Sequence, residues 1–451
     1  MTRPTTVALL AALCACSGPA PVQTDAGMPE LFDPLSMPET PTVSLDNFTS
    51  ASTCGGCHTK HYAEWKTSMH SYALIDPVYR AIVNVRQADY DGLQDRFCLQ
   101  CHTAIGTRSG DVKRNFSFDA LASITLEGIT CESCHLVSRM ERDYNSGHVL
   151  DDTGPIRGPI ANAAASAFHD SEHSDLFAQS SFCGGCHDVI EVSGLNLERP
   201  YQEWLRSPAE QADQSCQSCH MPEYTGSAAP GAPERTLHEH RWVGVDMPIS
   251  DGFVDATELA DLKTRIQSLL DTAASLSLDS SASISAGSQL DLYVTIENKI
   301  AAHNLPTGST FNRQVWLDLT VKDGTGQVIY STGQLDANGD LQDHFSELAP
   351  YGDADLIVLS SRFVDKHGNP EVFPWRAAEL TNHSLSPMYR RTFTLFVPTG
   401  ASTTGPLDIQ ARLRFRAFPP FLLRRLGLAD KVDRVPIFDI ATASRSVPVV
   451  P

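Results

Sequence analysis

Five copies of one short pattern, Cys-x-x-Cys-His, constrain this chain more than any other feature. The cysteine pairs are Cys54/Cys57, Cys98/Cys101, Cys131/Cys134, Cys183/Cys186 and Cys216/Cys219, and the histidines that follow them are His58, His102, His135, His187 and His220. The chain has 12 cysteines, and the other two, Cys14 and Cys16, lie at the extreme N-terminus. No cysteine remains for a structural disulfide, so we expect a fold built around these five sites.

The spacing within each copy suits covalent attachment of haem. Two cysteines three positions apart can form thioethers with the two vinyl groups of one haem, and the next histidine then binds the iron. Zinc sites also use Cys-x-x-Cys, but zinc does not require a histidine directly after each pair. A redox-active dithiol would occur once, beside a βαβ pattern. The sequence therefore predicts five covalently bound haem c groups, with these cysteines as attachment points and these histidines as proximal ligands.

Histidines are numerous enough to supply a second ligand for every iron. The chain has 16, and the five proximal ones leave 11. A haem with two histidine ligands has no open position, which suits electron transfer better than substrate binding. We interpret four of the remaining histidines as surface or packing residues, namely His61, His344, His367 and His383.

The residues around the motifs resemble those of the cytochrome c-554 family, which is related to multihaem proteins of the hydroxylamine oxidoreductase type. The resemblance rests on Tyr62, Trp65, Ser68 and His70 after the first motif, on Phe182 to Asp188 around the fourth, on His240-Arg-Trp-Val-Gly244, and on Ala302-His-Asn-Leu-Pro-Thr-Gly308. It covers most of the chain after residue 48 and is specific for multihaem cytochromes, but not for one reaction.

The resemblance makes His70 the best candidate for a distal ligand. His70 is too close in sequence to the first motif to bind that haem, so we expect it to serve a neighbouring one. The other candidates are His148 in a glycine-containing loop, His169 with His173 as its rival, His240 with His238 as its rival, and His303 between two predicted strands.

The first motif and its surroundings are echoed by the fourth. Cys-Gly-Gly-Cys-His occurs at both, and Tyr-x-Glu-Trp follows at Tyr62 and again at Tyr201. A duplicated haem-pair module would explain the echo, although two copies are weak evidence for a repeat. The position that corresponds to His70 is Ala209, so the second copy has to obtain its ligand elsewhere.

The chain divides by composition and periodicity. Residues 1–16 read as an export signal that ends in a lipobox-like Leu13-Cys-Ala-Cys16, with Cys16 as the lipidated residue, although simple cleavage is the alternative. Residues 17–47 read as a flexible tether. Residues 48–254 form the pentahaem part, mainly helix and loop, and haem supplies much of its core. Residues 255–275 predict a connecting helix, capped by Asp255 with Glu258 three positions on.

From residue 276 to residue 451 the hydrophobic period is two. Leu290, Leu292, Val294 and Ile296 alternate with polar residues, and similar runs follow. We therefore expect a multidomain protein whose C-terminal domain is an antiparallel, immunoglobulin-like β-sandwich. The arginines at 412, 414 and 416 alternate on one strand, as a solvated face or as partners for haem propionates.

The charge and the motifs narrow the function. The formal net charge of −20 disfavours nucleic acid. We expect an exported electron carrier with redox protein partners, either periplasmic or held at the outer membrane by a lipid anchor, and able to assemble with other cytochromes. The alternative is a multihaem oxidoreductase that acts on a small nitrogen or sulfur compound at one open haem. Related pentahaem nitrite reductases mark that haem with lysine, whereas all five motifs here end in histidine. A third possibility is that the sandwich is a docking module.

Overall fold

The computed structural model describes residues 40–163 and 166–450. The export signal, Cys16 and most of the tether lie outside the described residues. The described residues belong to one compact unit by their contacts. None of the helices within these ranges combines the length and hydrophobicity that a membrane span requires.

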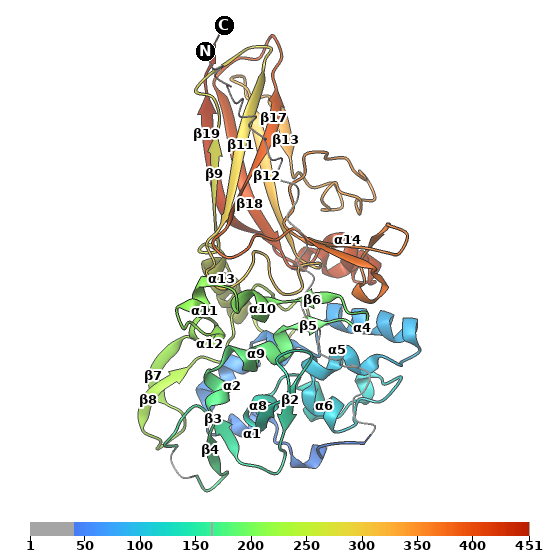
Figure 1. The fold of residues 1–451 in the computed structure, drawn as a ribbon, viewed down its shortest axis with the longest axis vertical. Coiled ribbons are helices and arrows are strands. Elements are labelled where there is room, and N and C mark those ends of the chain that lie inside the picture. Colours follow the sequence, from blue (N-terminus) through green and yellow to red (C-terminus); the bar gives the residue numbers. More distant parts are fainter. Residues whose placement is uncertain (1–39, 164–165, 451) are drawn as a thin grey trace, which may run out of the picture. The chain divides into compact units, whose positions relative to one another are not determined.

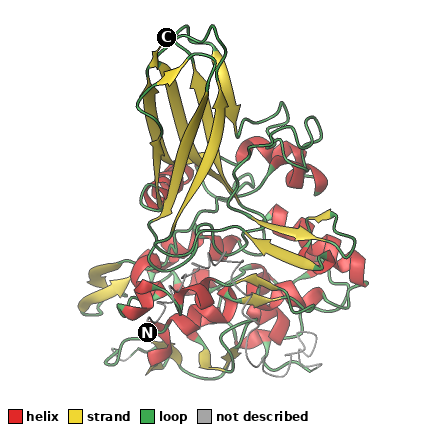
Figure 2. Cartoon of the chain, turned by 45° about the horizontal axis from the view of Figure 1, so that its top comes forward, coloured by secondary structure: helices red, strands yellow, loops and turns green. Residues whose placement is uncertain are grey.

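The N-terminal part, to about residue 250, is made of short helices and loops, as the sequence predicts (Figures 1 and 2). The second to fifth motifs each form the C-terminal end of a helix, whereas only the first cysteine of the first motif lies in one. These helices are α1 (Ala51–Cys54), α5 (Asp95–His102), α8 (Cys131–His135), α9 (Ser180–His187) and α12 (Cys216–His220). Residues three apart share one face of a helix, so two cysteines within one helix project side by side. In four of the five motifs, the helix thereby presents both attachment points to the same haem.

The other helices of this part connect the motifs. They are α2 (Thr59–Lys66), α3 (Met69–Tyr72), α4 (Pro77–Tyr90), α6 (Ala104–Arg108), α7 (Ser123–Leu126), α10 (Pro200–Trp204) and α11 (Pro208–Gln211). Four two-stranded pairs lie between them: β1 (Val137–Met140) with β2 (His148–Leu150), β3 (Ile156–Gly158) with β4 (Ser171–His173), β5 (Val189–Ile190) with β6 (Asn196–Glu198), and β7 (Glu223–Ser227) with β8 (Glu234–His238). Three-residue to six-residue 3₁₀ turns occur at Leu45–Asn47, Phe118–Ala120, Asp175–Ala178, Pro374–Arg376 and Ala429–Arg434.

The sequence echo corresponds to a repeated local structure. A Cβ atom on Gly55 would lie 2.5 Å from the Tyr62 ring, and one on Gly184 would lie 2.6 Å from the Tyr201 ring. Each tyrosine ring in turn stacks on the tryptophan that follows it, with centroids 5.9 Å apart in both copies. Glycine is therefore required at this motif position because an aromatic ring packs directly on the backbone.

A single helix leads to the sheet-rich part. Helix α13 (Ala256–Leu270) begins at Asp255, whose side chain accepts hydrogen bonds from the backbone N–H groups of Thr257 and Glu258. The Glu258 carboxylate accepts one in return from the Asp255 backbone N–H, which completes a capping box. Buried Ile266 and Leu270 join the apolar core of the sheets. A helix with the expected cap is present here, but it ends at Leu270 and strand β9 begins at Ala274, so it is shorter than the predicted span of 255–275.

The strands after this helix form two main antiparallel sheets. One has the order β17-β11-β9 and the other β13-β12-β18-β19. Their bounds are β9 (Ala274–Asp279), β11 (Gln289–Asn298), β12 (Gln314–Lys322), β13 (Val328–Thr332), β17 (Arg390–Pro398), β18 (Leu407–Arg416) and β19 (Phe438–Val447). Smaller elements are the pair β10 (Ile284–Ser285) and β20 (Val449–Val450), the sheet of β14 (Ser361–Val364), β15 (Pro370–Glu371) and β16 (Glu379–Asn382), and helix α14 (Pro420–Arg425).

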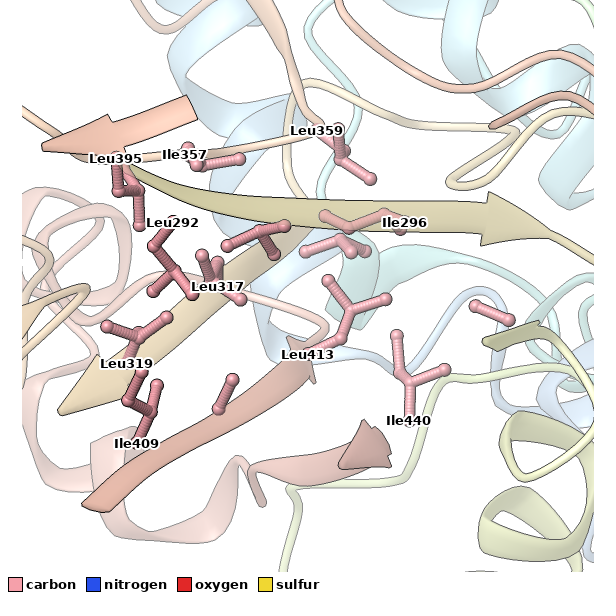
Figure 3. Packing of buried hydrophobic residues seen from close by; sticks show 14 of the residues in the cluster. Leu292, Ile296, Leu317, Leu319, Ile357, Leu359, Leu395, Ile409, Leu413 and Ile440 are labelled. Carbon is pink, nitrogen blue, oxygen red and sulfur yellow. The ribbon is translucent and has the colours of Figure 1, made fainter. Parts of the chain in front are cut away.

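The two main sheets share one hydrophobic core (Figure 3). Leu292 and Ile296 come from β11, and Leu317, Ile409 and Leu413 come from the other sheet; all five are buried. Alternate residues of a strand face opposite sides, so the period of two in the sequence supplies this core. The antiparallel, sheet-rich C-terminal part is confirmed, while the immunoglobulin-like topology stays a prediction.

The strand arginines take part in ion pairs within the sheet. Arg412 and Arg414 both contact the Asp318 carboxylate, at 2.6 and 3.1 Å, and Arg414 also contacts Asp439. Arg416 is buried and donates from Nε to the Gln314 side chain. The side chains of these arginines therefore bind neighbouring strands of the sheet, because acidic and amide partners lie directly across on β12 and β19.

Candidate functional site: paired histidines

Histidine rings face one another in four pairs, each joining a motif histidine to a histidine from elsewhere in the chain. The ring centroids lie 6.3 or 6.4 Å apart in the pairs His58–His169, His187–His70, His135–His240 and His220–His303. Two imidazoles on opposite sides of one metal ion, each bound at about 2 Å, place their ring centroids about 6 Å apart. The spacing in all four pairs therefore fits one iron between two histidines.

The ring orientations differ between the pairs. The interplanar angle is 17° for His135–His240 and 21° for His220–His303, which is close to parallel. It is 31° for His58–His169 and 48° for His187–His70. The four pairs are thus distinguishable by geometry.

Backbone carbonyls fix which ring nitrogen of these histidines is free. Nδ1 of a motif histidine lies 2.9 Å from the Ala228 oxygen for His58, 3.0 Å from Ala73 for His102, 2.6 Å from Arg157 for His135 and 3.2 Å from Val243 for His220. A carbonyl oxygen only accepts, so Nδ1 carries the proton and Nε2 keeps its lone pair for a metal. On the facing side, His169, His240 and His303 donate from Nδ1 to a backbone oxygen in the same way.

Burial keeps six of the rings of these pairs and motifs neutral, which metal binding requires. Burial lowers the pKa of His240 to about 3 and that of His303 and His70 to about 4. It also lowers the pKa of the motif histidines His102, His135 and His220. At neutral pH an unprotonated nitrogen is therefore available at each of these positions.

The motifs also lie close to one another through their cysteines. The thiols of Cys54 and Cys131, of Cys101 and Cys186, and of Cys183 and Cys216 lie close enough to shift each other's pKa. These contacts place the first motif beside the third, the second beside the fourth and the fourth beside the fifth. All ten described cysteines are free of disulfides. The attachment points are therefore arranged as a cluster of neighbouring sites.

Two predicted attachment points, Cys57 and Cys219, differ from the rest in their setting. Cys57 lies outside helix α1, in a turn where its backbone N–H donates to the Cys54 oxygen at 3.1 Å. Cys219 lies within α12 but is exposed, whereas the other nine described cysteines are partly buried. Its Sγ lies 4.0 Å from Oγ of the adjacent Ser218.

The ten motif cysteines therefore do not share one setting, because α1 ends before Cys57 and the surface position of Cys219 leaves its thiol open to solvent. Their role as attachment points stays a prediction that rests on the motif alone.

A buried arginine next to the third motif fits the acidic groups of haem. Arg157 Nη1 is buried and has no hydrogen-bond partner among the described residues. The Arg157 backbone oxygen also accepts a hydrogen bond from His135 Nδ1, so this arginine lies next to the third motif. An orphaned guanidinium N–H is costly unless an acceptor is present, and a haem propionate would be one. Together with the ring spacing, this fits haem as the missing group.

Four of the five predicted distal histidines are brought opposite a motif histidine. His70 faces the fourth motif and not the first, as expected from its place in the chain. Neither rival faces a motif histidine within the described residues; His238 Nδ1 donates to the Met221 oxygen, and His173 Nε2 lies 3.6 Å from the Asp175 carboxylate. His61, interpreted as a packing residue, is held through Nε2 by the Tyr224 hydroxyl at 2.9 Å. Its ring centroid lies 6.4 Å from that of His58, about as far as that of His169, and 4.6 Å from that of His240.

The structure does not support His148 as a distal ligand. Its Nε2 donates to the Phe182 oxygen at 2.7 Å, and its Nδ1 lies 3.7 Å from Cys186 Sγ. It thus has the opposite tautomer to the seven carbonyl-held histidines of the pairs and motifs, and it packs behind the fourth motif. The short strand β2, which begins at His148, turns the ring toward α9, and the glycine-rich loop gave no hint of that pairing.

His102 of the second motif has no facing histidine among the described residues. Its ring instead stacks on Tyr79, with centroids 3.8 Å apart and an interplanar angle of 10°. The Tyr79 hydroxyl is buried and has no hydrogen-bond partner in the described part of the chain. Burial raises the pKa of this phenol well above its usual range, so it stays a donor. The second motif therefore differs chemically from the other four.

The histidine pair of the fifth motif replaces a ligand that the second sequence copy has lost. Ala209 stands where His70 stands in the first copy, and its backbone N–H donates to the Ala301 oxygen at 3.2 Å. The loop that follows Ala301 carries His303. The sheet-rich part thus delivers a histidine beside the place where the helix no longer offers one.

Comparisons with known proteins agree with this site. Residues 53–136 match the family model described as cytochrome c554 and c-prime. The fold is similar to the crystal structure of a penta-heme cytochrome c552 from Thermochromatium tepidum, with a TM-score of 0.61 and 19% identity, covering 89% of this chain and 99% of that one. No curated protein matches this chain. The resemblance to multihaem c-type cytochromes that the motifs indicate is confirmed.

Some residues of the site could not be identified from the sequence as site residues. The carbonyls that fix the motif histidines belong to Ala73, Arg157, Ala228 and Val243, and a backbone group leaves no residue-type signature. Tyr79 lies between motifs with no pattern around it. Trp242 had a signal, because it lies within the His240-to-Gly244 segment on which the family resemblance rests.

Proposed function

We propose that this chain is an exported cytochrome with five covalently bound haems that carries electrons between redox proteins. The observation that carries the proposal is the set of four facing histidine pairs at 6.3 to 6.4 Å. Such pairs close both axial positions of an iron, which favours electron transfer over substrate binding.

The residues of the chain have separate tasks in this function. The ten motif cysteines hold the group covalently, and the histidine pairs provide both axial nitrogens. The backbone carbonyls fix the ring tautomer and orientation, as the outer partners of metal-bound histidines generally do. When bound, haem supplies one-electron oxidation and reduction of its iron. The folded chain keeps the neighbouring motifs together, so electrons can pass between them.

Mass spectrometry and electron paramagnetic resonance (EPR) of the purified, oxidised protein test this proposal. We expect the added mass of five haems and low-spin signals from four bis-histidine irons. His303→Ala should convert one low-spin signal to a high-spin one, while His344→Ala, which changes another loop histidine of the sheet-rich part, should leave all signals unchanged. A mature chain without covalent haem would reject the proposal.

The second motif supports a second candidate function, an oxidoreductase acting on a small nitrogen or sulfur compound. It rests on the absence of a facing histidine at His102 within the described residues. An iron held by His102 alone would leave one position for an external ligand. The buried Tyr79 hydroxyl is an uncommitted donor near the second-motif cysteines, both of which act on its pKa.

Ligand titration separates the two functions. For the oxidoreductase we expect one high-spin signal that shifts when nitrite or hydroxylamine is added, and turnover with an electron donor. Tyr79 stacks beside the His102 ring, so Tyr79→Phe should change the signal of that iron without changing the four low-spin signals. If all five irons are low-spin and insensitive to both compounds, the carrier function alone remains.

The location and partners also belong to the proposal. Cys16 would carry a lipid that holds the protein at the outer membrane, and the partners would be redox proteins or other cytochromes. The net charge of −20 supports partners with basic or weakly charged surfaces. Cys16→Ala should move the protein from the membrane fraction to the soluble periplasmic fraction. If the Cys16→Ala variant fractionates like the wild type, the lipid anchor is rejected and the alternative, a periplasmic protein produced by simple cleavage of the signal, remains.

A further inference from the structure

Trp242 lies between the histidines of two different motifs. Its ring centroid is 4.5 Å from that of His70, at 59°, and 5.1 Å from that of His240, at 70°. His70 faces His187 of the fourth motif, whereas His240 faces His135 of the third. The indole is therefore in T-shaped contact with His240 and in tilted contact with His70, the histidines that face two different motifs.

The backbone of Trp242 has an unusual conformation. Its φ angle is +44°, in the left-handed region that bulky side chains rarely adopt. Such a conformation costs energy and persists only where surrounding contacts enforce it. Here the turn directs the side chain back toward His240, two residues earlier, and toward His70. The strain is located at the residue that makes both ring contacts.

The segment around Trp242 contacts the ligands of three motifs. The His238 backbone oxygen accepts a hydrogen bond from His240 Nδ1. The Val243 backbone oxygen accepts one from Nδ1 of His220 in the fifth motif. The His240 backbone N–H donates to Glu64, which attaches the segment to helix α2. We call residues 238–243 the histidine strap. It supplies one ligand, orients a second and contacts a third through Trp242.

The thiol contacts leave a place for such a residue. They join the first motif to the third, and the second and fifth to the fourth. Between the third motif and the fourth, Cys134 of the third lies near enough to Cys183 and Cys186 of the fourth for their charges to interact. The row of rings His240, Trp242 and His70 adds a direct side-chain contact between these two groups of sites.

We propose that Trp242 is a positioning residue that sets the ring orientations of His70 and His240 and thereby couples the third and fourth haem sites. The inference rests on the proposed function, because it takes both histidines as iron ligands. When haem is bound, transfer of one electron between the two sites would make or break no bond and would move no proton. Trp242 binds neither iron, so it acts only through the two imidazoles.

EPR of the intact five-haem protein tests the role of Trp242. The low-spin signal depends on the angle between the two imidazole planes, which is 17° for His135–His240 and 48° for His187–His70. Trp242→Leu should shift these two signals and leave those of His58–His169 and His220–His303 in place. It should also slow electron redistribution between the two groups of sites after rapid partial reduction. Trp242→Phe, which keeps a ring, should restore most of both properties.

The control changes the same strap without removing the ring. Arg241→Gln should leave all four signals and the redistribution rate unchanged. If Trp242→Leu keeps the wild-type signals and rate, the positioning role is rejected while the electron carrier stands. If Trp242→Leu shifts all four signals equally, its effect is general loosening and the proposal is also rejected. If the wild-type protein itself lacks bis-histidine signals, the proposed function fails first.

Discussion

Glu203 and Asn304 are joined by two hydrogen bonds between helix α10 and the loop that carries His303. The carboxylate accepts from the Asn304 backbone N–H at 3.0 Å and from its side-chain amide at 2.9 Å. It also accepts from the Thr307 hydroxyl at 2.6 Å. One side chain of the helix-rich part thus satisfies three donors of the loop on which the histidine pair of the fifth motif depends.

Removing this carboxylate should disturb one haem site selectively. Glu203→Ala leaves three donors without their acceptor, and we expect the free energy of unfolding to fall by about 2–4 kcal/mol. The His303 loop should loosen, so one low-spin EPR signal should lose intensity to a high-spin one. The control is Glu234→Gln, whose side chain is exposed. Loss of stability with all low-spin signals intact would show that Glu203 does not hold the ligand loop.

The glycine of the fourth motif should not tolerate a methyl group. In Gly184→Ala the new Cβ would lie 2.6 Å from the Tyr201 ring, which is closer than any real contact. Overpacking of this kind costs about 1–3 kcal/mol, measurable by chemical denaturation. Gly244→Ala is the matched control, because no atom lies within 4 Å of its added Cβ. Equal stability of the two variants would contradict the ring-on-backbone packing.

A buried ion pair near the second motif should be essential for stability. Arg86 and Glu191 contact each other at 2.6 Å, and both side chains are almost fully buried. Glu191→Gln leaves the guanidinium charge without its partner, so we expect a loss of about 3–5 kcal/mol in urea unfolding. Asp91→Asn breaks the exposed pair with Arg114 and should cost less than about 1 kcal/mol. Similar losses for both variants would contradict this.

Asp76 should make stability depend on pH. Burial raises the pKa of its carboxyl from 3.8 to about 6, so the folded protein binds this proton more tightly than the unfolded chain. Stability therefore falls as the pH rises from about 4 to about 6, by at most about 3 kcal/mol, and stays lower above that range.

The variant Asp76→Asn isolates this effect. Its amide oxygen can still accept from the Val78 backbone N–H, which Asp76 caps at 2.9 Å, so helix α4 keeps its start. We expect the variant to be more stable than wild type at pH 8 and nearly equal to it at pH 4, as measured by chemical denaturation. A constant difference between the two values of pH would rule out the shifted pKa as the cause.

The distal ligands show how far sequence reasoning reached. His70 and His240 were identifiable because they lie in segments that resemble a known family, and the structure places both opposite motif histidines. His148 had only a glycine-rich loop in its favour, and pairing of β2 with β1 directs its ring to the Phe182 carbonyl instead. A loop's composition shows that it can turn, but the strand partner decides where its side chains lie.

The sequence by itself determined the cofactor chemistry, because thioether formation needs two cysteines and an adjacent histidine in fixed local order. It also determined the alternating core of the sheets and the cap of α13, which depend on neighbours a few positions apart. Only the tertiary structure decided the pairing of His58 with His169 and of His220 with His303, and the exception at His102. A second axial ligand can come from any part of the chain that folding brings across the haem, and no local spacing records that distance.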